Sequence, residues 1–313
     1  MATVIPAGQS RRSLLAATVA AATVSISTPS AAKFAAGVGL IDLELSRGAL
    51  KGHDNVRLRT MTLWGTDHQA AVRQSARHRL RHADVMAVAI ADTFARIAPD
   101  SVLSLVVASP IQQSGETQAI DIEQLMFAYD WMAAQGVRIV VQTFVGRNSQ
   151  AFRRAYNHAL ERGLILVVSA GNGPDENPVP AFPAAYGGAI SISSAALGAA
   201  FASEDRVLAA NGSAISSRRS YVDFAVAPPP VSDYRADRDP DAAASLGSSR
   251  ATAVAGGVLA GLSIRETIEG VDSARAVLSK YAAPGVPVWA AQGLLDVDRI
   301  AREASVRQRF GAA

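Results

Sequence analysis

The sequence predicts an α/β protein built on a mainly parallel β-sheet with helices on both faces. From residue 35 onward, short apolar runs rich in β-branched residues alternate with longer segments of helical period. The runs are apolar on both faces, as strands between two helical layers are. The 313 residues are 49% hydrophobic and 18% charged, which indicates a globular chain with a large core and excludes disordered, collagen-like and coiled-coil classes.

The expected elements follow directly from this alternation. Each expected helix is long enough to serve as a crossover between parallel strands. The expected strands are residues 37–41, 102–108, 137–143, 164–169, 189–193 and 221–225. The expected helices are residues 66–80, 82–97, 120–135, 149–162, 248–269 and 272–280.

Composition limits the chemistry and the partners. Thirty Lys and Arg against 27 Asp and Glu leave a net charge of +3, too small a basic excess to favour nucleic-acid binding. The chain has no cysteine, so disulfides, thiolate metal sites and a catalytic thiol are excluded. The acidic residues lack a recognisable ligand spacing, and we expect neither a metal nor a cofactor. Hydroxyl, imidazole, carboxylate and amide groups remain as the side chains that could carry out a reaction.

Residues 1–32 are predicted to be a signal peptide, and the paired Arg11 and Arg12 suggest the twin-arginine type. An apolar stretch at 14–24 and small residues at 30–32 complete the pattern. An uncleaved signal anchor and an Ala-rich tail are the alternatives. We expect residues 33–313 to form one exported domain, periplasmic or secreted, with no other membrane span.

Two polar residues stand at the ends of expected elements. Asp42 follows the run 37–41, at the carboxyl end of a strand, where open α/β sheets place their sites. His82 begins a helix of small apolar residues. A turn or cap role for Asp42 and a solvent-facing His82 are the alternatives, and His68, before an arginine-rich helix face, is the rival histidine.

Two further groups complete a chemical set. Asn172 lies in a glycine-flanked turn after the run 164–169, where its amide can donate to an oxyanion. Ser249 lies at the start of a helix, where free N–H groups favour negative charge. Taken singly, they are also explained by an Asn-Gly turn and a helix cap. With Asp42 and His82 they are the groups that an acyl-transfer enzyme needs at one sheet edge.

The order Asp42, His82, Asn172, Ser249 and the surrounding motifs resemble the subtilisin-like serine proteases, peptidase family S8. The supporting segments are 98–101, 167–172, 182–186, 227–228 and 293–296. The resemblance implies a three-layer fold in which Ser249 is the nucleophile, His82 the base, Asp42 the residue that orients it and Asn172 an oxyanion donor. It also implies a substrate cleft formed by Thr143, Phe144, Val145, Gly146, Ala170 and Gly171.

The chain departs from the family pattern near these residues. Leu43 and Glu44 follow the acid, so a hydroxyl that could bond the carboxylate is expected to be lost. Val145 replaces a glycine and is expected to narrow the cleft. Arg250 replaces an apolar residue, and we hypothesise that it pairs with Glu44 or Asp84. Residues 33–41 alone lie between the predicted cleavage site and the acid, so maturation without an N-terminal pro-domain is expected.

The resulting prediction is a monomeric serine endopeptidase that hydrolyses peptide bonds through an acyl-enzyme on Ser249, with a peptide or protein as substrate. The first alternative is a non-enzymatic relative whose cleft binds a peptide or protein segment. The second keeps the serine chemistry for another acyl substrate, such as an ester.

Overall fold

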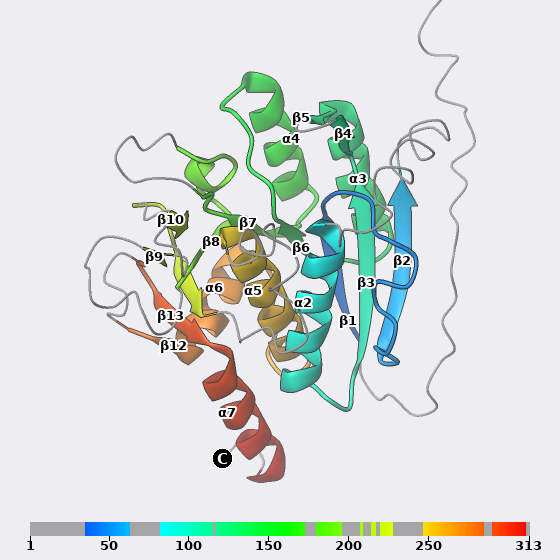
Figure 1. Ribbon diagram of the computed structural model, residues 1–313. Coiled ribbons are helices and arrows are strands. Elements are labelled where there is room, and N and C mark those ends of the chain that lie inside the picture. The colour runs from blue at the N-terminus through cyan, green and yellow to red at the C-terminus, as the bar shows by residue number, and fades with distance from the viewer. Residues whose placement is uncertain are drawn as a thin grey trace, which may run out of the picture.

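A nine-stranded sheet forms the centre of the fold, in the order β12-β13-β11-β8-β7-β6-β1-β3-β2 (Figure 1). The computed structural model describes residues 35–62, 82–114, 117–172, 180–195, 207–208, 214–216, 220–227, 247–284 and 290–310. Neighbouring strands of this sheet pair in parallel, except β12 with β13. The strands are β1 (Ala35–Ile41), β2 (Val56–Thr62), β3 (Val102–Ser109), β6 (Ile139–Gln142), β7 (Ile165–Ser169), β8 (Ile190–Ser194), β11 (Phe224–Ala227), β12 (Ala282–Ala283) and β13 (Gly293–Asp296).

Helices cover both faces of this sheet, which confirms the predicted fold class. One buried cluster joins one face of the sheet to side chains of α2, α5, α6 and α7, and a second joins the opposite face to α3 and α4. The helices are α2 (His82–Ile97), α3 (Ile122–Ala134), α4 (Gln150–Glu161), α5 (Ser248–Leu262), α6 (Val271–Tyr281) and α7 (Val297–Phe310). Outside the main sheet, β4 (Ile111–Ser114) pairs with β5 (Thr117–Ile120), and β9 (Val207–Leu208) with β10 (Ala214–Ser216).

Helix α5 is the most deeply buried helix among those described, since all of its residues are buried. Its small side chains allow it to approach α2 closely. A Cβ added at Gly257 would lie 2.7 Å from the Ile90 carbonyl oxygen of α2. This packing holds the first turn of α5 and the first turn of α2 in fixed positions.

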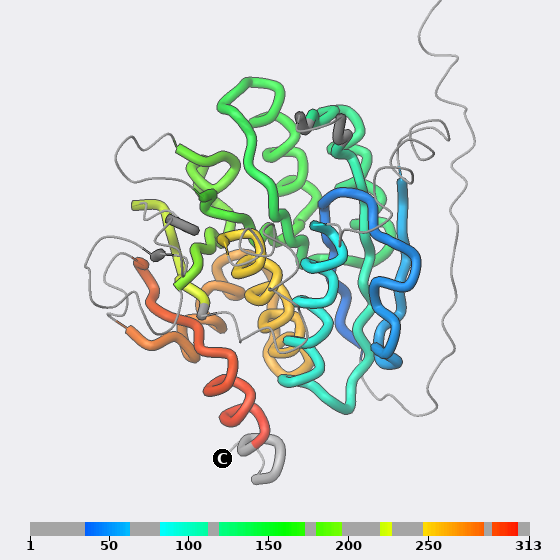
Figure 2. Tube along the Cα trace, viewed as in Figure 1, coloured from blue at the N-terminus to red at the C-terminus, as the bar shows by residue number. Residues whose placement is uncertain are grey.

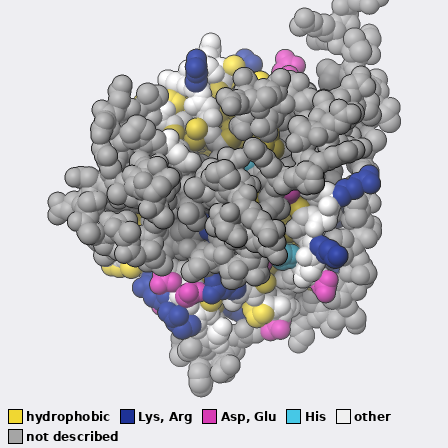
Figure 3. Space-filling model, viewed as in Figure 1, with side chains coloured by type: hydrophobic (Ala, Val, Ile, Leu, Met, Phe, Trp, Pro, Cys, Tyr) yellow, Lys and Arg dark blue, Asp and Glu magenta, His cyan; other side chains and the backbone are white. Residues whose placement is uncertain are grey.

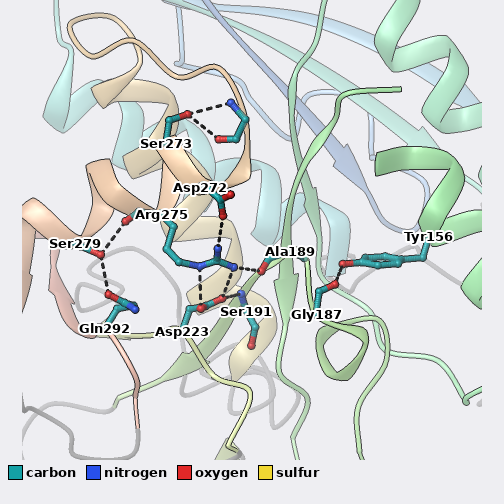
Figure 4. A network of polar contacts seen from close by, with 11 residues as sticks. Tyr156, Gly187, Ala189, Ser191, Asp223, Asp272, Ser273, Arg275, Ser279 and Gln292 are labelled. Atoms are coloured by element: carbon teal, nitrogen blue, oxygen red, sulfur yellow. Dashed lines mark hydrogen bonds and ion pairs between the residues drawn. The ribbon is translucent and has the colours of Figure 1, made fainter. Parts of the chain in front are cut away.

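An ion-pair network ties α6 to the sheet (Figure 4). Arg275 on α6 donates from Nε to Asp223, at 3.0 Å, and from Nη2 to the Ala189 carbonyl, at 2.9 Å. The same carboxylate accepts from the Ser191 N–H at 2.9 Å. A single guanidinium therefore joins α6 to the residues that precede β8 and β11.

Two expected boundaries are wrong. The helix expected over 248–269 ends at Leu262, where Ser263 is the C-cap and its hydroxyl donates to the Ala260 carbonyl, one of the last carbonyls that lack a partner within the helix. The strand expected over 221–225 begins only at Phe224. Tyr221 instead lies in a turn, where its hydroxyl accepts from the Ala181 N–H at 2.9 Å.

Strand β2 was not predicted, because it is not apolar on both faces. This strand lies at the edge of the sheet, and Arg57 and Arg59 are exposed on it. A half-exposed edge strand lacks the doubly apolar pattern that identifies the buried ones.

On the face drawn in Figure 3, the described basic and acidic side chains are interspersed and form no large patch of one sign.

None of the helices in the described ranges is long and apolar enough to cross a membrane. The predicted signal at 1–32 and the expected helix at 66–80 lie outside the described residues, so export stays a prediction.

Candidate active site

The candidate residues gather at the carboxyl edge of three adjacent strands. Strand β1 lies between β6 and β3 although it comes first in the chain. In Figure 2 its blue tube runs beside the blue-green tube of β3, with which it pairs. Asp42 directly follows β1, Thr143 follows β6, and Asn172 follows β7. Because β7, β6 and β1 are neighbours, these segments end at the same edge of the sheet. His82 and Ser249 begin the helices α2 and α5.

The Asp42 carboxylate and the His82 imidazole are in direct contact. Nδ1 of His82 lies 2.8 Å from Oδ2 and 2.9 Å from Oδ1 of Asp42. Because a carboxylate only accepts, this nitrogen carries the proton and Nε2 is the basic nitrogen. Nε2 makes no hydrogen bond with the residues that the structure describes. Asp42 is 2% exposed, whereas the His82 side chain is 36% exposed.

The pKa of His82 is raised above its ordinary value of 6.5. Burial lowers this pKa, but the negative charge of Asp42 and its hydrogen bond outweigh the effect of burial. The imidazolium is thus stabilised in place, as a base that takes up a proton during a reaction requires.

Thr143 corrects the expectation that Asp42 has lost its hydroxyl partner. The Thr143 hydroxyl donates to Oδ2 of Asp42, and the Leu43 N–H donates to Oδ1 at 2.6 Å. The hydroxyl therefore comes from the end of β6 instead of from the residue after the acid. Thr143 lies outside the motif around Asp42, and the sequence predicted it only as a residue of the cleft.

The side chain of Ser249 contacts the backbone of the same threonine. Its hydroxyl donates to the Thr143 carbonyl oxygen at 2.7 Å, and the residue is 9% exposed. Thr143 thus contacts both the carboxylate paired with His82 and the hydroxyl of Ser249. Ser249 is the second residue of α5, where backbone N–H groups lack partners within the helix.

The Asn172 amide is anchored by its oxygen. Oδ1 accepts from the Ser248 N–H at 2.9 Å and from the Ser248 hydroxyl at 2.8 Å. The NH₂ end makes no hydrogen bond with other described residues. Gly247 allows the amide to lie against the start of α5, since a Cβ at this position would be 2.6 Å from Nδ2. The arrangement leaves an amide donor beside the first turn of a helix.

The expected cleft residues also lie at this edge. Ala170 is fully buried, and the Gly146 N–H donates to the Phe182 carbonyl at 2.8 Å. Val145 is 44% exposed, and its Cγ1 is 3.7 Å from the position of a Cβ at Gly171. The valine side chain therefore stands at the surface beside the segment that carries Asn172.

Two charged residues near the site, Arg250 and Asp84, are buried. Arg250 is 7% and Asp84 2% exposed, and Asp84 accepts from the Ser46 N–H at 2.8 Å. Arg250 does not point into bulk solvent, and its pairing with Asp84 or Glu44 stays a prediction. The rival His68 lies outside the described residues. In the described parts of the chain, no group of three His, Asp or Glu residues could hold a metal ion.

Comparisons with known proteins identify the family and the fold of the chain. A covered parallel sheet with these groups at one edge is the framework of an α/β serine hydrolase. The chain belongs to the subtilase family, whose model matches residues 61–311. The match includes His82, Asn172 and Ser249 but begins after Asp42, so the position of the acid depends on its contact with His82.

Solved structures share the fold. The prenylagaramide maturation protease PagA superposes with a TM-score of 0.53 at 13% identity, over 86% of this chain and 94% of PagA. The self-cleaved protease domain of PatA gives a TM-score of 0.54 at 14% identity, over 87% of this chain and 97% of that domain. No curated protein sequence matches the chain.

Proposed function

We propose that the protein is a serine endopeptidase that hydrolyses peptide bonds through an acyl-enzyme on Ser249. The main support is the pair of contacts made by Thr143. Its hydroxyl donates to Asp42, which holds His82, and its carbonyl accepts from Ser249. Thr143 thereby links the Asp42–His82 pair to the hydroxyl of Ser249, and family membership supports serine peptidase chemistry.

Acylation follows from the proton positions. Rotation about χ1 of Ser249 moves its hydroxyl from the Thr143 carbonyl toward Nε2 of His82. The hydrogen bond to Thr143 that is given up is worth about 1 kcal/mol. Nε2 of His82 takes the proton while Oγ attacks the substrate carbonyl carbon. Asp42 holds the imidazole in the reactive tautomer and stabilises the imidazolium.

The developing oxyanion requires donors beside the start of α5. The Asn172 NH₂ group and the Ser249 N–H fill this role, and a side-chain donor of this kind contributes about 3–4 kcal/mol. His82 then gives its proton to the leaving amine, the C–N bond breaks, and the acyl group stays on Ser249. Water repeats the sequence, with His82 as its base, and releases the acid product.

The cleft favours a restricted set of substrates. Val145 adds a β-branched side chain next to Gly171, which narrows the space for an extended peptide. Selective cleavage of particular segments is therefore expected instead of general degradation.

Covalent labelling tests the proposal. The protein is incubated with a fluorophosphonate probe and measured by intact mass, beside Ser249→Ala and His82→Ala. His158→Ala is the matched control, because His158 also pairs with an aspartate at 2.8 Å but on α4. We expect one adduct in the parent protein and in His158→Ala, and none in the two site variants. A folded parent protein without an adduct would contradict the peptidase proposal and favour a peptide-binding role.

A further inference from the structure

Two buried serines connect the end of β7 to the start of α5. The hydroxyl oxygens of Ser169 and Ser248 are 2.6 Å apart, and these residues are 1% and 0% exposed. Ser248 also contacts Oδ1 of Asn172, at 2.8 Å, and the Gly171 N–H lies 3.2 Å from Oγ of Ser169. The four groups form a continuous chain that ends on the amide of Asn172.

The direction of this chain is determined by its donors. The Ser248 N–H can only donate, so its partner at 2.9 Å on Asn172 is the amide oxygen. The Ser248 hydroxyl gives its proton to the same oxygen and must accept from Ser169. The Ser169 oxygen in turn accepts from the Gly171 N–H. Each hydroxyl proton is used once, and the bonds polarise one another in one direction.

We propose that Ser169 is a positioning residue for the Asn172 amide, a role that rests on the proposed function. An asparagine side chain has two orientations related by exchange of its oxygen and nitrogen. The wrong orientation presents a partial negative charge to the oxyanion. The Ser248 N–H already selects the amide oxygen, and Ser169 reinforces this orientation by holding the proton of the Ser248 hydroxyl on Oδ1.

The burial of Ser169, which is 1% exposed, makes its hydrogen bonds significant. A hydroxyl in an apolar interior costs free energy unless it is hydrogen-bonded, and alanine would fill the strand position at no such cost. Ser169 has a partner on each side, whereas Ser191 on β8 is equally buried, at 2%, and its Oγ has no hydrogen-bond partner among the described residues. Ser191 is therefore the matched control.

A double-mutant cycle tests the proposal. The second-order rate constant of fluorophosphonate labelling is measured for Ser169→Ala and Ser191→Ala, each alone and combined with Asn172→Ala. We expect Ser169→Ala to slow labelling about 3- to 10-fold, the range that one hydrogen bond supports. With Asn172→Ala the further loss should be below about twofold, and Ser191→Ala should have no effect. An equal loss in both backgrounds would overturn the proposal, because Ser169 would then act on the fold or on Ser249 directly.

A second measurement does not depend on activity. The side-chain amide of Asn172 is observed by NMR in protein labelled with ¹⁵N-asparagine and assigned with Asn172→Ala. We expect its resonances to shift in Ser169→Ala and to stay in place in Ser191→Ala. Unchanged resonances in folded Ser169→Ala protein would also overturn the proposal. If the parent protein is not labelled, only the proposed peptidase function is refuted. The side-chain amide resonances of Asn172 then decide whether Ser169 positions this amide.

Discussion

Three histidines in the described part of the chain pair with an aspartate at the same distance, 2.8 Å, yet their surroundings differ. His82 pairs with Asp42, which is 2% exposed. His158 and His53 pair with aspartates whose side chains are 38% and 61% exposed. The distance within a pair therefore does not distinguish the proposed catalytic base, His82, from the other two histidines.

The difference lies in what else each carboxylate accepts. Asp42 receives a backbone N–H and the Thr143 hydroxyl, both from the edge of the sheet. Asp130, the partner of His158, instead receives the Arg162 guanidinium at 2.6 Å, whose side chain is 52% exposed. The first carboxylate holds the imidazole of His82 in one orientation, and the second belongs to a solvated network.

Replacement of the acid should separate these pairs most strongly. Asp42→Asn preserves the shape of the side chain but removes the charge that holds Nδ1–H, so Nε2 is no longer reliably the basic nitrogen. We expect labelling by fluorophosphonate to slow by about 10³- to 10⁴-fold. Asp130→Asn is the matched control and should leave the rate unchanged. Similar losses in both variants would mean that the substitutions act through folding.

A smaller loss is expected from crowding the amide of Asn172, the proposed oxyanion donor. Gly247 and Gly270 are the N-cap residues of α5 and α6, and neither has a positive φ. A Cβ at Gly247 would contact the Asn172 amide, with 2.6 Å to Nδ2, whereas a Cβ at Gly270 meets nothing within 4 Å. Gly247→Ala should slow labelling by about 100-fold and Gly270→Ala should not. A Gly247→Ala protein that labels at the parent rate would exclude Asn172 as the donor.

Thr143 should have a still smaller effect. Thr143→Val keeps the volume of the side chain and the carbonyl that accepts from Ser249 but removes the hydroxyl from Asp42. We expect labelling to slow by about 10-fold, as for a hydrogen bond to a charged group. Thr143→Ser should recover most of the rate. If valine and serine slow the reaction equally, the hydroxyl is not the group that matters.

Much of the fold was predictable because its central strands are apolar on both faces, as in the buried run of β7. The positions of Asp42 and His82 were predictable from the ends of expected elements. The hydroxyl on Asp42 was not, because it comes from a residue 101 positions away. The bond between Ser169 and Ser248 likewise spans 79 positions. Side-chain bonds across a fold leave no periodic signal in a single sequence.

The smallest effect is expected at the exposed pair His53–Asp92. The hydrogen bond and the charge of Asp92 raise the pKa of His53 above 6.5, although burial opposes them. A raised pKa stabilises the folded protein below pH 6.5, and this contribution is lost as the pH rises through the pKa of the folded state. Because Asp92 is 61% exposed, the contribution should be only about 0.2–1 kcal/mol. Urea unfolding of the parent protein and of His53→Ala should differ by this amount at pH 5.5 and converge at pH 8.5. A larger difference at pH 8.5 than at pH 5.5 would show that His53 stabilises the fold by packing and not by its charge.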